Sequence, residues 1–259
     1  MQKDAPELLR KLSLMMRISA FLWIVIGILQ IVLGGLTVLS QIHEGNFSFS
    51  NIYVFIFFIG VVNLSFSMKN WKFATSILHI PTGILGRFKP LWGSIAALVY
   101  NLLFGAVVGV VGVAYELTIR AFVMRRKEQF IQLEQEYISA ICANPAGEAI
   151  LMQEGANRLM DRGFQGGNAV LTTQRFVYKK GMLGGKLDPN RKKPTLAVRL
   201  DEIVGVQRGK YGPNKNLLDI RTANAKSYRF YVADFDAWER AINRAISILP
   251  QTNETEVTS

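Results

Sequence analysis

Cysteine and histidine are almost absent from this chain. Its 259 residues include one cysteine, Cys142, and two histidines, His43 and His79. A single cysteine excludes an intrachain disulfide and a cysteine-rich metal site. Both histidines lie in the apolar half and suggest no Ser–His–Asp arrangement, and no H-E-x-x-H, Walker or dinucleotide-binding motif occurs. We therefore expect no catalytic residues, no metal and no cofactor: this protein is not expected to be an enzyme.

Charge is missing from two long stretches of the N-terminal half. Residues 18–68 contain Glu44 as their only Asp, Glu, Lys or Arg, and residues 91–115 contain none. A helix needs about 20 apolar residues to cross a bilayer core. The pattern predicts spans at about 18–40, 51–68 and 91–115 within a helical membrane domain of residues 18–124.

The segment 73–88 admits two interpretations. It is apolar up to Arg87, lies between Lys72 and Lys89, and is interrupted by Pro81 and Gly83. It is either a thin, kinked span or a re-entrant piece protected by its neighbours. Cytoplasmic loops of membrane proteins carry an excess of Lys and Arg, and an even number of spans would keep the basic C-terminal half inside. We therefore predict about four membrane segments in a multi-pass cell-membrane protein, with both the N-terminus and the C-terminal domain in the cytoplasm.

The ends of the apolar half carry positive charge. Residues 1–17 have helical spacing of cations and apolar residues, which predicts an amphipathic helix on the cytoplasmic headgroups. The last span leads into an exit helix and stalk at 116–144, and its cluster Arg125, Arg126 and Lys127 is expected to lie at the membrane surface. Glu116 is four residues before Arg120, which predicts an ion pair along the helix.

Small residues recur in the last apolar run. Gly105 and Gly109 are four apart and Gly112 follows, with Asn101 nearby. Small residues at this spacing let membrane helices pack closely, and an Asn can hydrogen-bond to a neighbouring helix. We expect these four positions to pack helices within the bundle, in preference to forming a dimer interface.

The C-terminal half changes from helical to alternating periodicity. Between residues 146 and 250, seven short apolar–polar stretches separated by Gly, Pro and Asn predict strands, and the segment after Asp234 predicts a closing helix. This half carries 18 basic and 10 acidic residues. We expect a strongly bent sheet capped by a helix, followed by a disordered tail at 251–259. The expected strands are 148–155, 156–162, 168–180, 195–200, 202–210, 216–223 and 226–233.

One segment of this half resembles a known family. Residues 167–178 read GNAVLTTQRFVY, followed by LDEI at 200–203, YRF at 228–230 and Trp238 in the expected helix. This order resembles the GRAM and bacterial pleckstrin-homology-like domains, over about 147–249. The resemblance implies a non-catalytic binding module for membrane lipids or proteins. The apolar half resembles multi-span proteins of Gram-positive bacteria, which implies no activity.

A dense group of cations follows the expected strand at 168–180. Glycines and prolines mark the segment as a loop, and Asp188 is the acid within it. Such clusters are typical of sites for anionic lipid headgroups, although a loop kept soluble by charge explains them equally well. The candidate lipid- or partner-binding residues are Lys179, Lys180, Lys186, Arg191, Lys192 and Lys193.

These features favour a membrane adaptor. Helices would hold a basic PH-like domain at the cytoplasmic face, where it binds anionic lipid or a protein partner. The alternatives are a subunit of a larger membrane assembly, including a homo-oligomer, and a small transporter or channel. We do not expect nucleic acid as a partner, because the basic domain is tethered to a bilayer.

Overall fold

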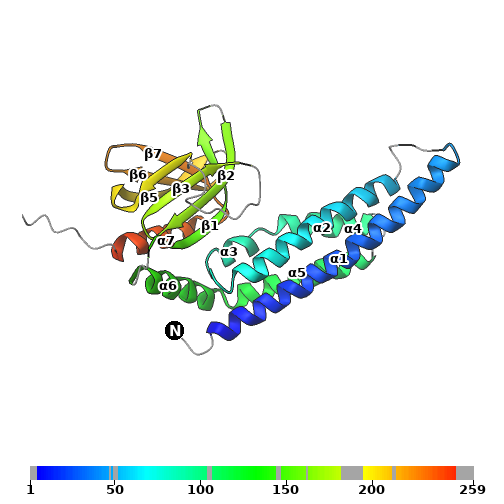
Figure 1. Cartoon of the computed structure of the whole chain (residues 1–259), viewed down its shortest axis with the longest axis horizontal. Helices are drawn as coiled ribbons and strands as arrows, with labels where there is room; N and C mark the ends of the chain where they lie inside the picture. Colours follow the sequence, from blue (N-terminus) through cyan, green and yellow to red (C-terminus); the bar gives the residue numbers. More distant parts are fainter. Residues whose placement is uncertain are drawn as a thin grey trace, which may run out of the picture. The chain divides into compact units, whose positions relative to one another are not determined.

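The computed structural model describes residues 5–46, 48, 52–103, 107–143, 147–161, 163–181, 195–211 and 214–248. These residues form two compact units (Figure 1). The first comprises residues 1–79 and 88–127; the second comprises residues 80–87 and 128–259.

The first unit is built on a long helical pair. Helix α1 (Ala5–His43) packs along α2 (Ile52–Ser76) in antiparallel fashion. The two backbones touch at glycines: a Cβ on Gly27 would lie 2.9 Å from the Gly60 carbonyl oxygen, and one on Gly34 would lie 2.8 Å from the Phe57 nitrogen. These glycines therefore set the close approach of the two helices, whereas the sequence pattern predicted glycine packing only in the 101–112 region.

Helix α1 is one unbroken element where the sequence suggested two. The sequence predicted an amphipathic helix at 1–17 and a separate span at 18–40, but α1 continues through Arg17 to His43. No proline follows Pro6 within α1, so nothing interrupts its hydrogen bonding. Of the described helices, α1 and α2 are long and apolar enough to cross a membrane.

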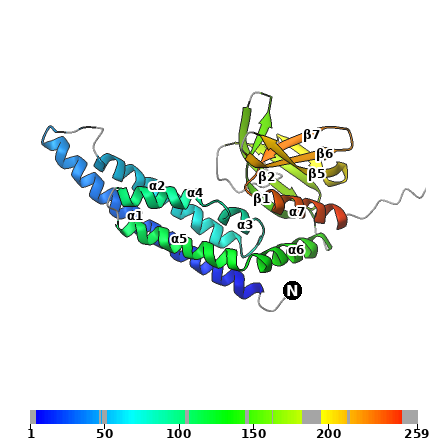
Figure 2. The ribbon, with the colours of Figure 1, turned by 180° about the vertical axis from the view of Figure 1, so that it is seen from behind.

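The prediction of about four membrane segments is wrong in two places. Residues 91–115 do not form one helix: α4 (Trp92–Leu103) and α5 (Val107–Arg125) are separate and pack on each other. The side chain of Asn101 occupies the place where a Cβ on Gly109 would lie. In a straight helix these positions would stand about 12 Å apart, so the chain reverses between them. Figure 2 shows α5 beside α1 from behind.

The segment 73–88 is not a span either. The first four residues of the segment, 73–76, are the end of helix α2. Within the rest of the segment there is one short helix, α3 (Ile84–Phe88). Residues 80–87 belong to the second unit. Pro81 and Gly83, with φ of +71° at Gly83, prevent a continuous helix here.

The second unit is a seven-stranded antiparallel sheet with helices packed on it. The strand order is β4-β3-β2-β1-β7-β6-β5, so β1 joins the two halves of the sheet by pairing with both β2 and β7. A short 3₁₀ turn, η1 (Leu200–Glu202), separates β4 from β5. The remaining elements are α6 (Lys127–Ala143), β1 (Ile150–Met160), β2 (Gly163–Thr172), β3 (Arg175–Lys180), β4 (Leu196–Arg199), β5 (Ile203–Tyr211), β6 (Asn214–Thr222), β7 (Ser227–Tyr231) and α7 (Phe235–Ile248).

The expected strand count is met with different boundaries. The first two expected strands are the single strand β1, because Gly155 lies within the ladder opposite Asn168. The expected strand at 168–180 is two strands, β2 and β3. Their turn is fixed by the Thr172 hydroxyl, which accepts the backbone N–H groups of Gln174 and Arg175 at 3.2 and 3.0 Å.

The core of this unit is aromatic. Trp238 of α7 is fully buried, and its ring lies 5.7 Å from that of Phe176, which in turn lies 4.9 Å from Phe230. Helix α6 adds Ile138 to the same core. The part of the expected stalk from residue 128 on therefore belongs to the same compact unit as the sheet.

Candidate functional site

One end of the sheet brings three connections together. The β1–β2 turn lies between Met160 and Gly163, which pair with each other, and Tyr211 ends β5. The ring of Phe164, at the start of β2, lies 5.1 Å from the ring of Tyr211. The backbone N–H of Gly181, just after β3, donates to the Gly166 carbonyl of β2 at 3.5 Å. We name this region, where residues 160–166, 178–181 and 210–211 meet, the hairpin end.

Two of the six predicted binding cations lie at the hairpin end. Lys179 and Lys180 are the last residues of β3, and Lys180 is exposed. The other four, Lys186, Arg191, Lys192 and Lys193, fall outside the described residues. Thr195, which precedes β4, donates its N–H to the Tyr178 carbonyl at 3.0 Å and accepts the Lys180 N–H on its hydroxyl at 2.9 Å. The residues that flank the basic segment 182–194 are therefore bonded to β2 and β3.

A glycine lets β2 and β3 approach at this site. A Cβ on Gly167 would lie 2.3 Å from the Lys179 carbonyl oxygen and 2.6 Å from the Tyr178 hydroxyl. That hydroxyl donates to the Gln165 carbonyl. Gly166 and Gly167 both lie within β2, opposite Asn157 and Ala156. The motif glycine is thus explained by close packing.

Arg175 of the family-like motif has a structural partner. Its guanidinium donates to both carboxylate oxygens of Glu148 at 2.7 Å. The Arg175 hydrogen bond holds the pKa of Glu148 below its usual value. Asp201 pairs with Arg199. Arg175 therefore ties the start of the domain to β3 at the end of the sheet remote from the hairpin end.

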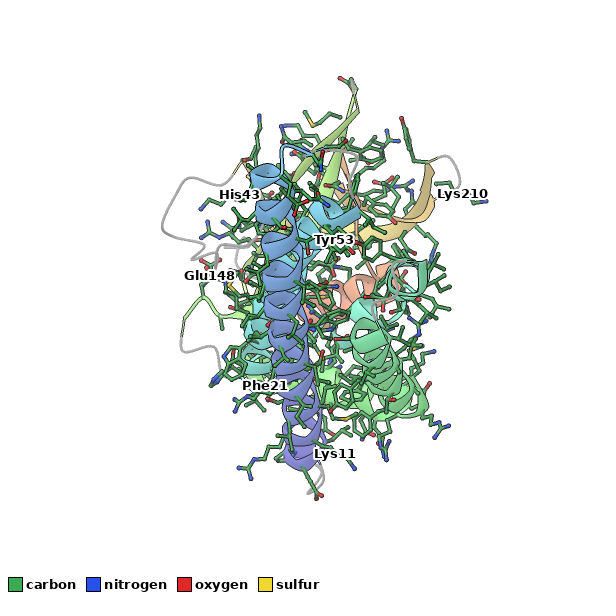
Figure 3. The ribbon with its side chains drawn as sticks, turned by 90° about the vertical axis from the view of Figure 1, so that its right-hand side faces the viewer. Lys11, Phe21, His43, Tyr53, Glu148 and Lys210 are labelled. Atoms are coloured by element: carbon green, nitrogen blue, oxygen red, sulfur yellow. The ribbon has the colours of Figure 1, made fainter. Side chains whose placement is uncertain are left out.

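The cations of the helical unit gather at one end. Ser13 donates to the Ala74 carbonyl at 2.7 Å, so the start of α1 lies beside the end of α2. Arg126 stacks over the Phe122 ring at 4.4 Å, and Lys11 faces the same ring at 5.6 Å. Figure 3 labels Lys11 at this end of α1 and His43 at the other. The charged end comprises Arg10, Lys11, Arg17, Lys69, Lys72, Lys89, Arg120, Arg125, Arg126 and Lys127.

Three of the four predicted helix-packing residues, Asn101, Gly109 and Gly112, lie in the described part of the chain. Asn101 is 3% exposed and donates to the Ala97 carbonyl at 2.7 Å within α4. Gly109 faces Asn101, and a Cβ on Gly112 would lie 2.8 Å from Ile26 of α1. Gly105 lies outside the described residues. The contact at Gly112 is compatible with packing inside one chain, and the role of all four residues stays a prediction.

Glu116 joins three helices. One of its carboxylate oxygens accepts the Ser19 hydroxyl, the Trp23 indole N–H at 3.3 Å and the Asn70 amide at 2.9 Å. Arg120, the partner expected from sequence spacing, donates instead to the carbonyls of Lys89 and Pro90 at 2.7 and 2.8 Å. These bonds hold the start of α4 beside the later part of α5. The spacing rule failed because both side chains found partners on other segments.

A second charged cluster lies inside the β domain. Thr82 donates to the Leu151 carbonyl of β1 at 2.8 Å, and the Gly83 N–H donates to Glu134 of α6 at 3.0 Å. Burial raises the pKa of Glu134, against the effects of the Gly83 N–H and the Arg240 guanidinium. Segment 80–87 therefore docks on β1 and α6 through buried polar contacts.

Glu154 of β1 belongs to the same cluster. It accepts the Ala233 N–H at 2.9 Å. Burial raises its pKa to about 7, and the nearby Asp234 and Glu134 carboxylates act in the same direction. Asp234 itself is 1% exposed. No sequence pattern reveals this cluster, because Glu134, Glu154 and Asp234 lie far apart along the chain. In the part of the chain that the structure describes, no group of three His, Cys, Asp or Glu residues could hold a metal ion.

Of the comparisons with known proteins, the one with solved structures found similar proteins. No protein-family model and no curated protein matches the chain. The C-terminal PH domain of human pleckstrin is 18% identical with a TM-score of 0.31, over 39% of this chain and 91% of that one. The Slm1 PH domain, solved with D-myo-inositol-4-phosphate, is 11% identical with a TM-score of 0.30, over 39% and 97%.

A protein from Leishmania infantum described as unknown is also similar. Its C-terminal domain is 12% identical with a TM-score of 0.31, over 39% of this chain and 87% of that one. The seven-stranded antiparallel sheet with its C-terminal helix fits the PH-like fold that the sequence motif suggested. The narrower GRAM assignment stays a prediction, since no family model matches.

Proposed function

We propose that this protein is a non-catalytic membrane adaptor whose PH-like domain binds anionic lipid at the cytoplasmic face. The observation that carries the proposal is the charge asymmetry of the helical unit. Every lysine and arginine of α1, α2, α4 and α5 falls at the charged end, whereas the chain between α1 and α2 contains Glu44 and neither Lys nor Arg. Such an excess of cations is typical of the cytoplasmic side.

The path of α4 and α5 supports the same orientation. In this proposal α1 and α2 each cross the bilayer. Helices α4 and α5 form a hairpin that enters and leaves on one side, supported by the contact between Asn101 and Gly109 and by the bonds from Arg120 to residues 89 and 90. The number of crossings is then even, so the N-terminus and the β domain share the cytoplasmic side. Irregular backbone at membrane depth is tolerated where protein covers it.

The lipid proposal is supported by the charge of the β domain. Residues 145–250 have 18 basic and 10 acidic residues, and six of the cations fall between 179 and 193. Each cation near an anionic leaflet contributes about 1 kcal/mol. Lys179 and Lys180 at the end of β3, with the basic segment 182–194 that follows that strand, are the candidate contacts. A protein partner is an alternative ligand for the same surface.

The test presents the full chain to a second membrane. The protein is reconstituted in nanodiscs of neutral lipid and mixed with sucrose-loaded vesicles, either neutral or containing phosphatidylserine. We expect sedimentation with the anionic vesicles alone, weakened by salt. Replacing Lys186, Arg191, Lys192 and Lys193 with Gln should abolish it. A matched control replaces Arg221 and Lys226, exposed cations around the β6–β7 turn, and should bind normally. Equal sedimentation with neutral vesicles would count against the lipid proposal.

A further inference from the structure

Segment 80–87 packs into the β domain although it is far from that domain in the sequence. Its buried side chains are Pro81, Thr82, Ile84 and Leu85, whereas Arg87 is exposed. Segments held by a limited set of contacts can open locally without unfolding the rest of a domain. We name segment 80–87 the strap.

The strap contacts two buried carboxyl groups of the β domain. The Gly83 N–H donates to one carboxylate oxygen of Glu134 at 3.0 Å. A Cβ on Gly86 would lie 2.9 Å from the Cβ of Asp234, so the strap backbone lies directly against that residue. Glu134 and Asp234 are 4% and 1% exposed. The docked strap therefore helps to exclude water from both acids.

The carboxyl group of Glu154 shares this environment. It accepts the Ala233 N–H at 2.9 Å, and the Cβ of Ala233 would lie 3.7 Å from a Cβ on Gly86. The Asp234 and Glu134 carboxylates both raise the pKa of Glu154, so the three acids are close enough for their charges to interact. The strap thus lies beside a cluster of three carboxyl groups contributed by β1, α6 and the start of α7.

The charged groups around the cluster leave no cation for a third carboxylate. From α7, the Arg240 guanidinium lies 3.6 Å from the second carboxylate oxygen of Glu134. From the strap itself comes Arg87, which is exposed. These two cations match Glu134 and Asp234 in number. Ionisation of Glu154 would add a negative charge beyond them, and an excess charge in a poorly hydrated place is costly.

We propose that the strap is pH-sensitive: it stays docked while Glu154 holds a proton and opens when that carboxyl ionises, because the open state lets water reach the acids. The inference goes beyond the proposed function, since it does not depend on what the β domain binds. The chain passes between the two units at 79–80, 87–88 and 127–128. Two of these passages flank the strap, so its opening detaches both from the sheet.

The direction of the response follows from linkage. Burial raises the pKa of Glu154 from 4.5 to about 7 in the docked state. The contribution of Glu154 to docking is therefore fully present below about pH 4.5 and is lost as pH rises through about 7. If opening restores the ordinary pKa, the equilibrium constant for opening should rise about tenfold between about pH 6 and about pH 8.

Hydrogen exchange of the full chain in nanodiscs tests the proposal. Peptides that cover the strap are compared with peptides from β2 and β3, with rates corrected for intrinsic exchange. We expect the strap to open more readily than β2 and β3 at every pH, and about tenfold more at pH 8 than at pH 6. Glu154→Gln should abolish this rise. A strap whose opening does not change with pH in wild type, or rises equally in Glu154→Gln, would overturn the inference.

Two further variants separate docking from titration. Gly86→Ala places a Cβ against Asp234 and should increase strap exchange several-fold at both pH values while keeping the rise; unchanged exchange would contradict docking at this point. His79→Gln removes the exposed titratable ring that precedes the strap and should leave the rise intact. Loss of the rise in this variant would assign the response to the histidine and refute the role of Glu154.

Discussion

Replacing Glu154 with Gln should stabilise the β domain at neutral and alkaline pH. Burial raises the pKa of Glu154 from 4.5 to about 7. The native state therefore keeps a proton that the unfolded chain releases, and charging the carboxyl in its buried place costs free energy. A glutamine at 154 keeps an oxygen for the Ala233 N–H and never ionises.

The sign and size follow from linkage. Because the native pKa of Glu154 is raised, its contribution is most favourable below about pH 4.5 and is lost as pH rises through about 7. At about 1.4 kcal/mol per pKa unit, the total loss is about 3 kcal/mol. Wild type and Glu154→Gln should thus be equally stable at low pH. Above about pH 7 the free energy of unfolding of the variant should exceed that of wild type by up to this amount.

Glu148→Gln is the matched control with the opposite sign. The Arg175 guanidinium lowers the pKa of Glu148, so the stability that this pair supplies is present above about pH 4.5 and is lost as pH falls through the lower native pKa. This variant should be less stable than wild type near neutral pH and converge with it in acid.

Hydrogen exchange of the full chain provides the assay. Peptides from β1, β2 and α7 report the opening free energy of the β domain, measured from about pH 3 to about pH 8 with rates corrected for intrinsic exchange. If Glu154→Gln opens more readily than wild type above about pH 7, the carboxylate is stabilising there and the reasoning is refuted.

Three further changes test the packing. Gly167→Ala should destabilise the β domain by about 2 kcal/mol or more, since its Cβ would lie 2.3 Å from the Lys179 carbonyl oxygen; unaltered exchange in β2 and β3 would contradict this. Asn70→Ala should cost the helical unit about 1 kcal/mol by removing an amide from Glu116, measured as a lower melting temperature in detergent. Thr82→Ala leaves the Leu151 carbonyl without its hydroxyl partner and should cost about 1–2 kcal/mol, seen as faster proteolysis between residues 77 and 91; unchanged cleavage would argue against docking of segment 80–87.

Periodicity predicted the β domain well because its strands obey local rules. Alternation from residue 148 onward located the strands, and the core position of Trp238 follows from its place on an amphipathic helix. Boundaries were less reliable at Gly155 and Thr172. Gly155 lies inside a paired strand, and the turn after Thr172 is held by a side-chain hydroxyl. Both features depend on contacts that the local sequence pattern does not contain.

Hydropathy predicted the helical half less well. The uncharged run at 91–115 is long enough for a span, yet it contains the reversal that brings Asn101 against Gly109. Apolar length alone does not distinguish one crossing from a hairpin. Segment 80–87 is similarly apolar enough to resemble a membrane segment, because it contains Ile84 and Leu85. In the structure both side chains are buried in the unit that contains the β domain.

The sequence predicted the cations of the candidate site but not the way in which the fold brings its residues together. The cations at 179–193 are evident from the sequence, whereas the meeting of Phe164 with Tyr211 joins residues almost fifty positions apart on strands that do not pair. No local pattern signals it. The acids Glu134, Glu154 and Asp234 are likewise far apart in the sequence, and the fold places them near one another.

The most direct measurement is the side of the membrane on which three residues lie. In a Cys142→Ser background, cysteines are placed singly at Gly45, Lys89 and Asn190, and intact cells are treated with a membrane-impermeant maleimide before and after permeabilisation. The proposed topology predicts labelling at 45 in intact cells, and at 89 and 190 only after permeabilisation. Labelling at 190 from outside would contradict a cytoplasmic domain, and labelling at 89 from outside would contradict the hairpin of α4 and α5.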